Sequence, residues 1–274
     1  YGLNEDLVKR AYDAGVDTIV TCDNGIAAVK EIAYAKSLGM TVIITDHHEL
    51  QEEIPPADVV VNPHQKDCPY PYKNLCGAGV AWKLVSALWE QLGVPEQELY
   101  EDLLLFAGFA TVGDVMNLTG ENRILVKEAL KLLKTTTHPG ISALIEVNEI
   151  SRETISAFHI GFVLGPCINA SGRLDTAKRA LELLKTTDYE KALVKAAELK
   201  ALNDERKSMT DDGVQQALDQ IENSDMKRDR VLVIYLPDCH ESLAGIIAGR
   251  IRERYYRPVF VLTRSQDGVK GSGR

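Results

Sequence analysis

The sequence lacks any apolar run long enough to span a bilayer, and its apolar stretches are short and strand-like. It also lacks a signal-peptide pattern at its start, so we expect a cytoplasmic protein without membrane attachment. A basic surplus is missing too, since 31 Lys and Arg stand against 40 Asp and Glu. A generic nucleic-acid coat protein would be basic. Any nucleic-acid binding must therefore depend on local positive charge and on metal ions.

Paired cysteines are also lacking: five cysteines are widely scattered, and none belongs to a Cys-x-x-Cys motif. Such an odd, dispersed set argues against a disulfide framework and against a structural zinc site. We expect mostly small buried thiols in a reducing compartment. The five are Cys22, Cys68, Cys76, Cys167 and Cys239.

Apolar strands alternate with helices near the start of the sequence. We predict a helix at residues 4–14 with Asn4 as its N-cap, a second helix at 27–38, and strands at 18–22, 41–45 and 58–61. This alternation predicts a parallel sheet covered on both faces, the α/β class. It resumes near the end, with a strand at 231–236, a helix at 242–255 and a strand at 258–262.

The middle of the chain has the periodicity of helices. They are predicted at residues 77–92, 96–110, 121–133, 141–147, 152–163 and 175–184. A turn rich in Gly, Asn and Ser is predicted at 168–173. Thr187 and Glu190 form a capping-box pattern that opens a long polar helix reaching about residue 222. Its dense charge suggests a solvated linker helix between two lobes.

Acidic motifs follow two of the predicted strands. Asp23-Asn24-Gly25 comes directly after the first strand, and Asp46-His47-His48 directly after the second. Ligands of open parallel sheets bind outside the carboxyl ends of the strands, so these motifs should converge. Asp-Asn-Gly alone is a common turn, but an Asp-His-His run at a strand end is a stronger signal.

A third acidic motif, Gly113-Asp114, ends an apolar helix. Together with Asp23 and His47, Asp114 would make a carboxylate and imidazole site that suits Mn²⁺ or Mg²⁺ rather than zinc. Paired metal ions in such sites clamp the attacking and leaving oxygens of a phosphoryl transfer.

Two short turns carry the same three residues, Ser171-Gly172-Arg173 and Ser272-Gly273-Arg274. A glycine-containing turn can direct backbone N–H groups at an anion, and the arginine can hold phosphate bidentately. Each turn alone is more often an ordinary loop. Their presence in two regions of a chain with a metal motif favours phosphate binding.

These motifs occur in an order that resembles the RecJ exonucleases of the DHH phosphoesterase superfamily. Besides the motifs already quoted, four segments carry the resemblance: Asn62-Pro63, Gly77-Ala78-Gly79, Ile168-Asn169-Ala170 and Leu202-Asn203-Asp204-Glu205-Arg206. Residues 240–250 and 271–274 resemble the DHHA1 domain of that family. Two departures are modest: Ser242 stands where the family usually has glycine, and Ser171 where it often has alanine.

The resemblance implies an α/β fold in three parts. These are a parallel-sheet DHH domain with a helical part at residues 1–174, linker helices at 175–229, and a smaller α/β DHHA1 domain at 230–274. The family's first motif, an Asp-x-Asp segment that supplies metal ligands, should lie upstream of Tyr1, and an oligonucleotide-binding fold should follow the DHHA1 domain. Both end domains are therefore expected to be incomplete, and this stretch alone is expected to be nearly inactive.

The implied activity is metal-dependent 5′–3′ hydrolysis of single-stranded DNA in repair and recombination, with two Mn²⁺ or Mg²⁺ ions in the intact protein. Implied partners are a single-strand-binding protein or a helicase. Asp23, His47 and Asp114 would be metal ligands, Asp46 would orient His47, and His48 would contact the scissile phosphate. Nucleic-acid phosphates would be bound by Asn169, Ser171, Arg173, His240, Ser272, Gly273 and Arg274.

Two other functions stay open at the level of sequence. One is a phosphodiesterase of the same superfamily that acts on short oligonucleotides or cyclic dinucleotides. The long helix and the Ile-Asn-Ala-Ser-Gly-Arg segment favour the exonuclease over it. The other is a non-catalytic DNA-binding scaffold, and the presence of Asp23, His47 and Asp114 argues against that alternative.

Overall fold

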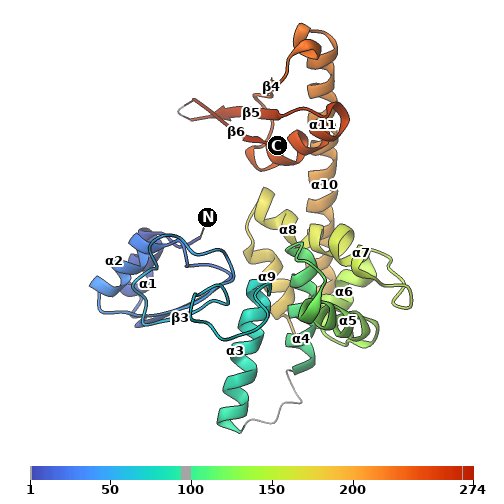
Figure 1. Cartoon of the computed structure of the whole chain (residues 1–274). Helices are drawn as coiled ribbons and strands as arrows, with labels where there is room; N and C mark the ends of the chain where they lie inside the picture. Colours follow the sequence, from blue (N-terminus) through green and yellow to red (C-terminus); the bar gives the residue numbers. More distant parts are fainter. Residues whose placement is uncertain (1, 94–99, 267) are drawn as a thin grey trace. The chain divides into compact units, whose positions relative to one another are not determined.

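The computed structural model describes residues 2–93, 100–266 and 268–274. The chain divides into two compact units. Unit 1 comprises Tyr1–His138 and Ile150–Phe162, and unit 2 comprises Pro139–Glu149 and Val163–Arg274. Each unit has its own three-stranded sheet, which confirms the α/β prediction (Figure 1). None of the helices in the described ranges is long and apolar enough to cross a bilayer.

Unit 1 begins with a parallel sheet of order β1-β2-β3. The elements are α1 (Glu5–Asp13), β1 (Thr18–Cys22), α2 (Val29–Ser37), β2 (Thr41–Thr45) and β3 (Val59–Val61). The predicted cap is confirmed, because Asn4 Oδ1 accepts a hydrogen bond from the backbone N–H of Leu7 at 2.9 Å. All three strands run in the same direction, so their carboxyl ends meet at one edge of the sheet.

The core of this part lies between the sheet and its two helices. The central strand β2 buries Val42 and Ile44 completely. They pack in one cluster with Val8 of α1 and Ile32 and Ala35 of α2. Ile43, on the opposite face of β2, is only partly buried, so the two faces of the sheet are covered unequally.

The helical part of unit 1 contains α3 (Gly77–Leu92), α4 (Tyr100–Gly113), α5 (Gly120–Thr135) and the short α7 (Ala157–His159). The predicted start of the second helix, residues 96–99, lies outside the described residues. The helix predicted at 152–163 is wrong in its first turn, since α7 begins at Ala157 and continues as a π-helix over Ile160–Leu164.

Unit 2 contains α6 (Pro139–Val147), α8 (Gly165–Leu174), α9 (Lys178–Lys185), α10 (Tyr189–Glu222), β4 (Leu232–Tyr235), α11 (Ala244–Tyr255), β5 (Val259–Ser265) and β6 (Gly268–Gly273). Short 3-10 turns lie at Asp225–Arg228 and Glu241–Leu243. Strand β4 pairs with β5 in parallel, and β5 pairs with β6 in antiparallel fashion.

Two predicted turns in unit 2 are regular structure instead. The segment predicted as a turn at 168–173 forms the second half of α8, where Ala170 and Ser171 are buried against neighbouring helices. Ser272 and Gly273 end the strand β6, paired with Val261 and Phe260 of β5. In both places tertiary packing and strand pairing override the local preference of Gly, Asn and Ser for turns.

The long helix α10 is packed rather than solvated. Asp188, not Thr187, is its N-cap, and its carboxylate accepts from the backbone N–H of Lys191 at 3.2 Å. One face is buried along the whole helix, at Ala192, Ala196, Leu199, Asn203, Thr210, Gly213, Ala217 and Ile221. The solvated-linker interpretation is therefore wrong, although the predicted helix itself is confirmed. The division at residues 174 and 229 stays a prediction.

The five cysteines are all free thiols. Cys76 and Cys167 are buried, Cys68 and Cys239 are partly exposed, and Cys22 is exposed. The expectation of mostly buried thiols is therefore wrong for three of them.

Candidate metal centre

Asp23 is placed by a strained turn at the end of β1. Its backbone adopts a left-handed conformation, φ 59°, which is costly for a residue with a side chain. The N–H of Asp23 donates to the carbonyl of Thr45 on β2 at 3.0 Å. Gly25 completes the turn at φ 112°, where an added Cβ would lie only 2.9 Å from Thr21 Oγ1. The Asp-Asn-Gly motif is thus a turn that directs the Asp23 carboxylate at the ring of His47.

Asp46 is a buried carboxylate that organises the segment after β2. Its Oδ1 accepts from the backbone N–H of His47 at 2.8 Å and lies 2.7 Å from Nδ1 of His48, while Oδ2 accepts from the N–H of Ile26 at 3.0 Å. Burial alone would raise the pKa of Asp46, but these hydrogen bonds lower it overall. The carboxylate is therefore held ionised.

The expected contact between Asp46 and the ring of His47 is wrong. Asp46 touches His47 at the backbone, and the ring that it orients is that of His48. An Nδ1 directed at this carboxylate leaves Nε2 of His48 as the atom that faces outward. The His48 side chain is 60 % exposed, so that nitrogen is accessible to a substrate.

Asp114 follows α4 at a second strained turn. Its N–H donates to Ala110 at 2.8 Å, and the next residue, Val115, has a left-handed φ of 57°. This turn brings a carboxylate oxygen of Asp114 to 3.3 Å from Nε2 of His47. Burial raises the pKa of Asp114, and the charge of Asp23 raises it further, against the opposing effect of His47.

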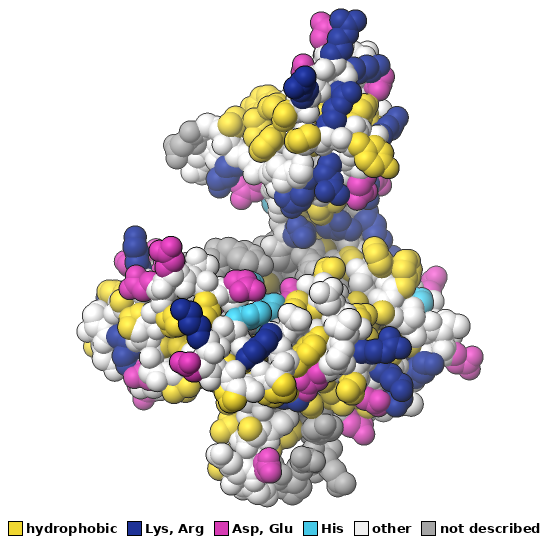
Figure 2. Space-filling model, viewed as in Figure 1, with side chains coloured by type: hydrophobic (Ala, Val, Ile, Leu, Met, Phe, Trp, Pro, Cys, Tyr) yellow, Lys and Arg dark blue, Asp and Glu magenta, His cyan; other side chains and the backbone are white. Residues whose placement is uncertain are grey.

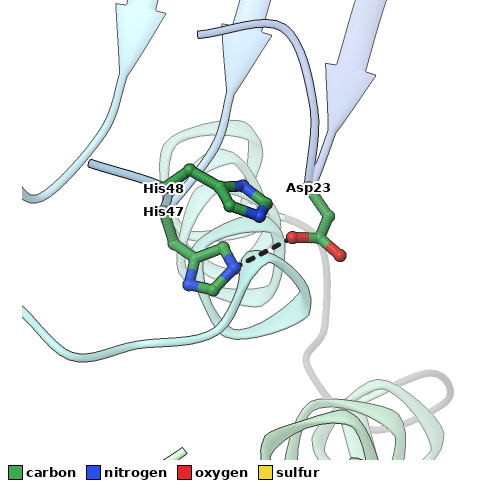
Figure 3. Close-up of side chains that lie close together, drawn as sticks. All are labelled: Asp23, His47 and His48. Atoms are coloured by element: carbon green, nitrogen blue, oxygen red, sulfur yellow. Dashed lines mark ion pairs between the residues drawn. The ribbon is translucent and has the colours of Figure 1, made fainter. Parts of the chain in front are cut away.

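The ring of His47 is the point at which these groups meet. Its Nε2 lies 3.0 Å from Asp23 Oδ1, as the close-up in Figure 3 shows, and 3.3 Å from Asp114 Oδ2. The Asp23 contact raises the pKa of His47 against the effect of burial. However, buried Nε2 has no well-aligned hydrogen-bond partner among the described residues. A protonated Nε2 attracts both carboxylates, and a deprotonated Nε2 directs its lone pair at the same place, where it can bind a metal ion.

Helix α3 approaches this centre closely at its first residue. Gly77 is buried, and a Cβ added there would lie 2.5 Å from Asp23 Oδ1 and 2.6 Å from Asp23 Cγ. Only glycine leaves room for the carboxylate. The buried Sγ of Cys76 caps the helix by accepting from the N–H of Gly79 at 3.4 Å. Sequence reasoning missed this role of Gly77, although the Gly-Ala-Gly start of the helix was a signal.

The donor set fits a hard divalent ion. Asp23, His47 and His48 each offer a ligand atom, and these atoms lie within 4.8 Å of one another. Asp114 adds a second carboxylate at the same nitrogen of His47. Carboxylate oxygens with imidazole suit Mn²⁺ or Mg²⁺. The side chains of His48 and Asp23 are 60 and 52 % exposed, so an ion has access. Figure 2 shows histidine at the surface of unit 1 with acidic side chains near it.

The residues expected to bind phosphate all lie in unit 2, and four of them lie around the 3-10 turn Glu241–Leu243 and the first turn of α11, which follows it directly. Around the 3-10 turn Glu241–Leu243, Arg173 Nη1 donates to the carbonyl of Ser242 at 3.2 Å, and His240 Nδ1 lies 2.8 Å from Ser242 Oγ. At the start of α11, Arg274 Nη1 donates to Ser272 Oγ at 2.8 Å.

Arg274 and Ser272 pack against Gly245, where an added Cβ would lie 2.7 Å from Arg274 Nη2 and 3.0 Å from Ser272 Oγ. Gly273 is a β6 residue that packs against Phe260. Asn169 is exposed on α8. Ser171 is fully buried and donates to the carbonyl of Ile168 at 3.0 Å, so the expectation that it binds phosphate is wrong.

Comparison with known proteins shows the family to which this chain belongs. The model of the DHH family, N-terminal domain, matches residues 3–109. The single-stranded-DNA-specific exonuclease RecJ of Escherichia coli is 38% identical over 289 residues, which are 100% of this chain and 50% of the relative. The chain belongs to the DHH family. It spans about half the length of this curated relative.

Solved structures of DHH-family RecJ proteins are similar over nearly the whole chain. Exonuclease RecJ bound to manganese has a TM-score of 0.86 and 34% identity, covering 100% of this chain and 66% of that one. RecJ of Thermus thermophilus in complex with Mn²⁺ has a TM-score of 0.83 and 32% identity, covering 95% of this chain and 38% of that one. Both of these relatives hold Mn²⁺.

Proposed function

We propose that this chain is the catalytic core of a metal-dependent 5′–3′ exonuclease that hydrolyses single-stranded DNA. The observation that carries the proposal is the meeting of Asp23, His47 and Asp114 at one nitrogen, 3.0 and 3.3 Å from the two carboxylates. The names of the RecJ relatives, which are single-stranded-DNA-specific exonucleases, support the choice of substrate.

In this proposal Asp23, His47 and Asp114 are ligands of Mn²⁺ or Mg²⁺. A bound divalent ion would polarise a phosphodiester and stabilise the charge that develops on its oxygens. The strained turns at Asp23 and Val115 and the bare Gly77 hold the two carboxylates close together. Their mutual repulsion is relieved when a cation is present, so these residues are preorganised for one.

His48 contacts the substrate, whereas Asp23, His47 and Asp114 bind the metal ion. Asp46 fixes Nδ1 of the ring, and Asn62 Nδ2 donates to the His48 carbonyl at 3.0 Å, so the segment is held from both sides. Nε2 would then donate a hydrogen bond to an oxygen of the scissile phosphate.

Unit 2 would bind the phosphates of the single-stranded DNA. Arg173, His240, Ser272 and Arg274 are the residues proposed for this, because they offer guanidinium, imidazole and hydroxyl donors. Such contacts position a strand without reading its bases. A helicase or a single-strand-binding protein fits as a partner, since either would supply single strands for repair or recombination in the cytoplasm.

The test uses the intact protein, Mn²⁺, long single strands labelled at the 5′ end, and dinucleotides. The proposal expects release of the 5′ label as mononucleotide from the long strands, and loss of that release in Asp23→Asn. Cleavage of dinucleotides alone would instead indicate a small-substrate phosphodiesterase. Binding of long strands without any hydrolysis in Mn²⁺ would indicate a scaffold.

A further inference from the structure

The buried face of α10 contains an arginine. Asn203, Thr210 and Gly213 are buried on that face, and Arg206 lies three residues after Asn203 and four before Thr210. Residues at these spacings lie above one another on a helix. Arg206 is therefore directed at the rest of unit 2 rather than at open solvent, and it is partly buried.

Arg206 lies between two packing contacts of α10. On one side, Asn203 Nδ2 lies 3.5 Å from the sulfur of Cys167 on α8. On the other side, Gly213 packs against α11 so closely that an added Cβ would lie 2.5 Å from Ile247 Cδ1. The arginine thus occupies the stretch of α10 between α8 and α11.

The guanidinium of Arg206 is held in place but its charge is not neutralised. Its Nε donates to Oδ1 of the buried Asn203 at 3.1 Å. In the described part of the chain no carboxylate forms an ion pair with it. The neighbouring acid, Asp204, is already paired with Lys200 and Lys207 at 2.7 and 3.3 Å.

Two further arginines lie close to it. Burial lowers the pKa of Arg206, and the charges of Arg173 on α8 and Arg250 on α11 lower it further. Arg250 is ion-paired with Asp211, while Arg173 donates to the carbonyl of Ser242. The carboxylate of Asp211, whose charge raises the pKa of Arg206, is thus already paired with Arg250. Figure 2 shows Lys and Arg side chains gathered where α10 passes α11.

Such an arrangement costs free energy unless an anion is bound. Gathering like charges in a partly buried place destabilises the fold. A flexible arginine that only covered apolar surface would extend its head into water, whereas Arg206 is fixed at Nε by a buried amide. Its two terminal nitrogens remain to hold an anion in the planar, bidentate way that matches phosphate.

We propose that Arg206 is a phosphate-binding residue that, with Arg173, holds the backbone of a single strand on unit 2. The inference rests on the proposed function for its ligand, and it adds a contact from the long helix to those of α8, the 3-10 turn and β6. A single-stranded DNA backbone is the ligand because the cluster offers charge and forked donors without reading bases.

The test measures binding of 5′-phosphorylated oligo(dT) to the intact protein in Ca²⁺, at several salt concentrations. We expect Arg206→Gln to raise the Kd about tenfold, the scale of one lost hydrogen bond to a charged group. The slope of log K against log salt should become shallower by roughly 0.7. Arg173→Ala should act in the same direction.

Arg252→Gln is the matched control. Arg252 is exposed on α11, two residues from Arg250 and hence on the other side of the helix. Its replacement by glutamine removes the same charge as Arg206→Gln does. Its Kd and salt slope should stay near those of the wild type. Equal effects of Arg206→Gln and Arg252→Gln would overturn the assignment of Arg206, as would a wild-type slope in Arg206→Gln.

Arg206→Lys separates a binding role from a structural one, and it carries the test if Arg206→Gln fails to fold. It keeps the charge but loses the fork, so we expect the wild-type salt slope with several-fold weaker binding. Wild-type affinity in Arg206→Lys would contradict a bidentate contact. If the wild-type protein itself does not bind oligo(dT), the proposed function fails and the role of Arg206 fails with it.

Discussion

Replacing Gly77 by alanine tests whether the metal centre depends on the close approach of α3. The new Cβ would lie 2.5 Å from Oδ1 and 2.6 Å from Cγ of Asp23, whereas carbon atoms pack at roughly 3.5 Å or more. The carboxylate must therefore retreat by about 1 Å. Metal–ligand distances tolerate only about 0.2 Å, so Asp23 would be lost as a ligand or pulled out of line.

The backbone of Asp23 offers little relief. Its N–H is bound to the Thr45 carbonyl at 3.0 Å, and its φ is already strained at 59°. Rotation of the side chain moves Cγ and Oδ1 but not Asp23 Cβ, which would lie 2.4 Å from the new Cβ, so α3 or the Asp23 turn must also shift. The free energy of unfolding should therefore fall by about 1–3 kcal/mol, the usual cost of overpacking.

The assay is a calorimetric Mn²⁺ titration of the intact protein beside the 5′-exonuclease reaction. We expect the Kd for Mn²⁺ to rise about 10- to 100-fold and kcat to fall about 100-fold. Gly79→Ala is the matched control, since its Cβ would meet only ordinary contacts of 3.5 to 3.7 Å with Leu75 and Cys76. A folded Gly77→Ala protein with wild-type Mn²⁺ affinity would refute the role given to Asp23.

Three further predictions concern other parts of the chain. Asp114→Ala should lower kcat at least about 100-fold with an unchanged melting temperature, because a charged ligand is lost; near-normal turnover in Mn²⁺ would remove Asp114 from the centre. Hydrogen bonds from Lys36 and the N–H of Val42, 2.7 Å each, hold the pKa of Asp58 below its usual value. Its stabilisation is thus present above the unfolded pKa, about 3.9, and is lost as the pH falls through the folded value. Urea unfolding should show that Asp58→Asn destabilises at about pH 6 but hardly at about pH 2; an equal effect at both would exclude the ionic contact. Gly108→Ala would place Cβ 2.7 Å from the Leu125 carbonyl oxygen, where α4 meets α5. Thermal unfolding should show that the free energy of unfolding falls by about 1–3 kcal/mol. The control Gly249→Ala, whose Cβ would enter open space, should not destabilise the protein.

The sequence by itself determined the features that depend on neighbouring residues and on strand order. The apolar strands and the Asn4 cap follow from short-range patterning, and both are present. Asp23 and His47 could be placed together because parallel strands end at the same edge of a sheet. Their predicted meeting with Asp114 is observed, with His47 Nε2 between the two carboxylates.

The tertiary structure decided which of two equivalent neighbours makes each contact. Asp46 could have oriented either histidine, and the direction of the chain after β2 gives it the ring of His48. Ser171 and Ser272 belong to the same three-residue motif, yet one is buried in α8 and the other lies on β6. Local sequence carries no information on what a segment packs against, so it cannot separate these cases.

Burial along α10 was likewise set by contacts between distant segments. Its charged sequence predicts an exposed helix, but small residues such as Ala196 and Gly213 let α6, α8 and α11 pack closely against one face. The roles proposed for Arg206 and Gly77 also depend on contacts between distant segments. The sequence around each residue predicts only a helix, and the distance to the neighbouring element is set by the folded chain.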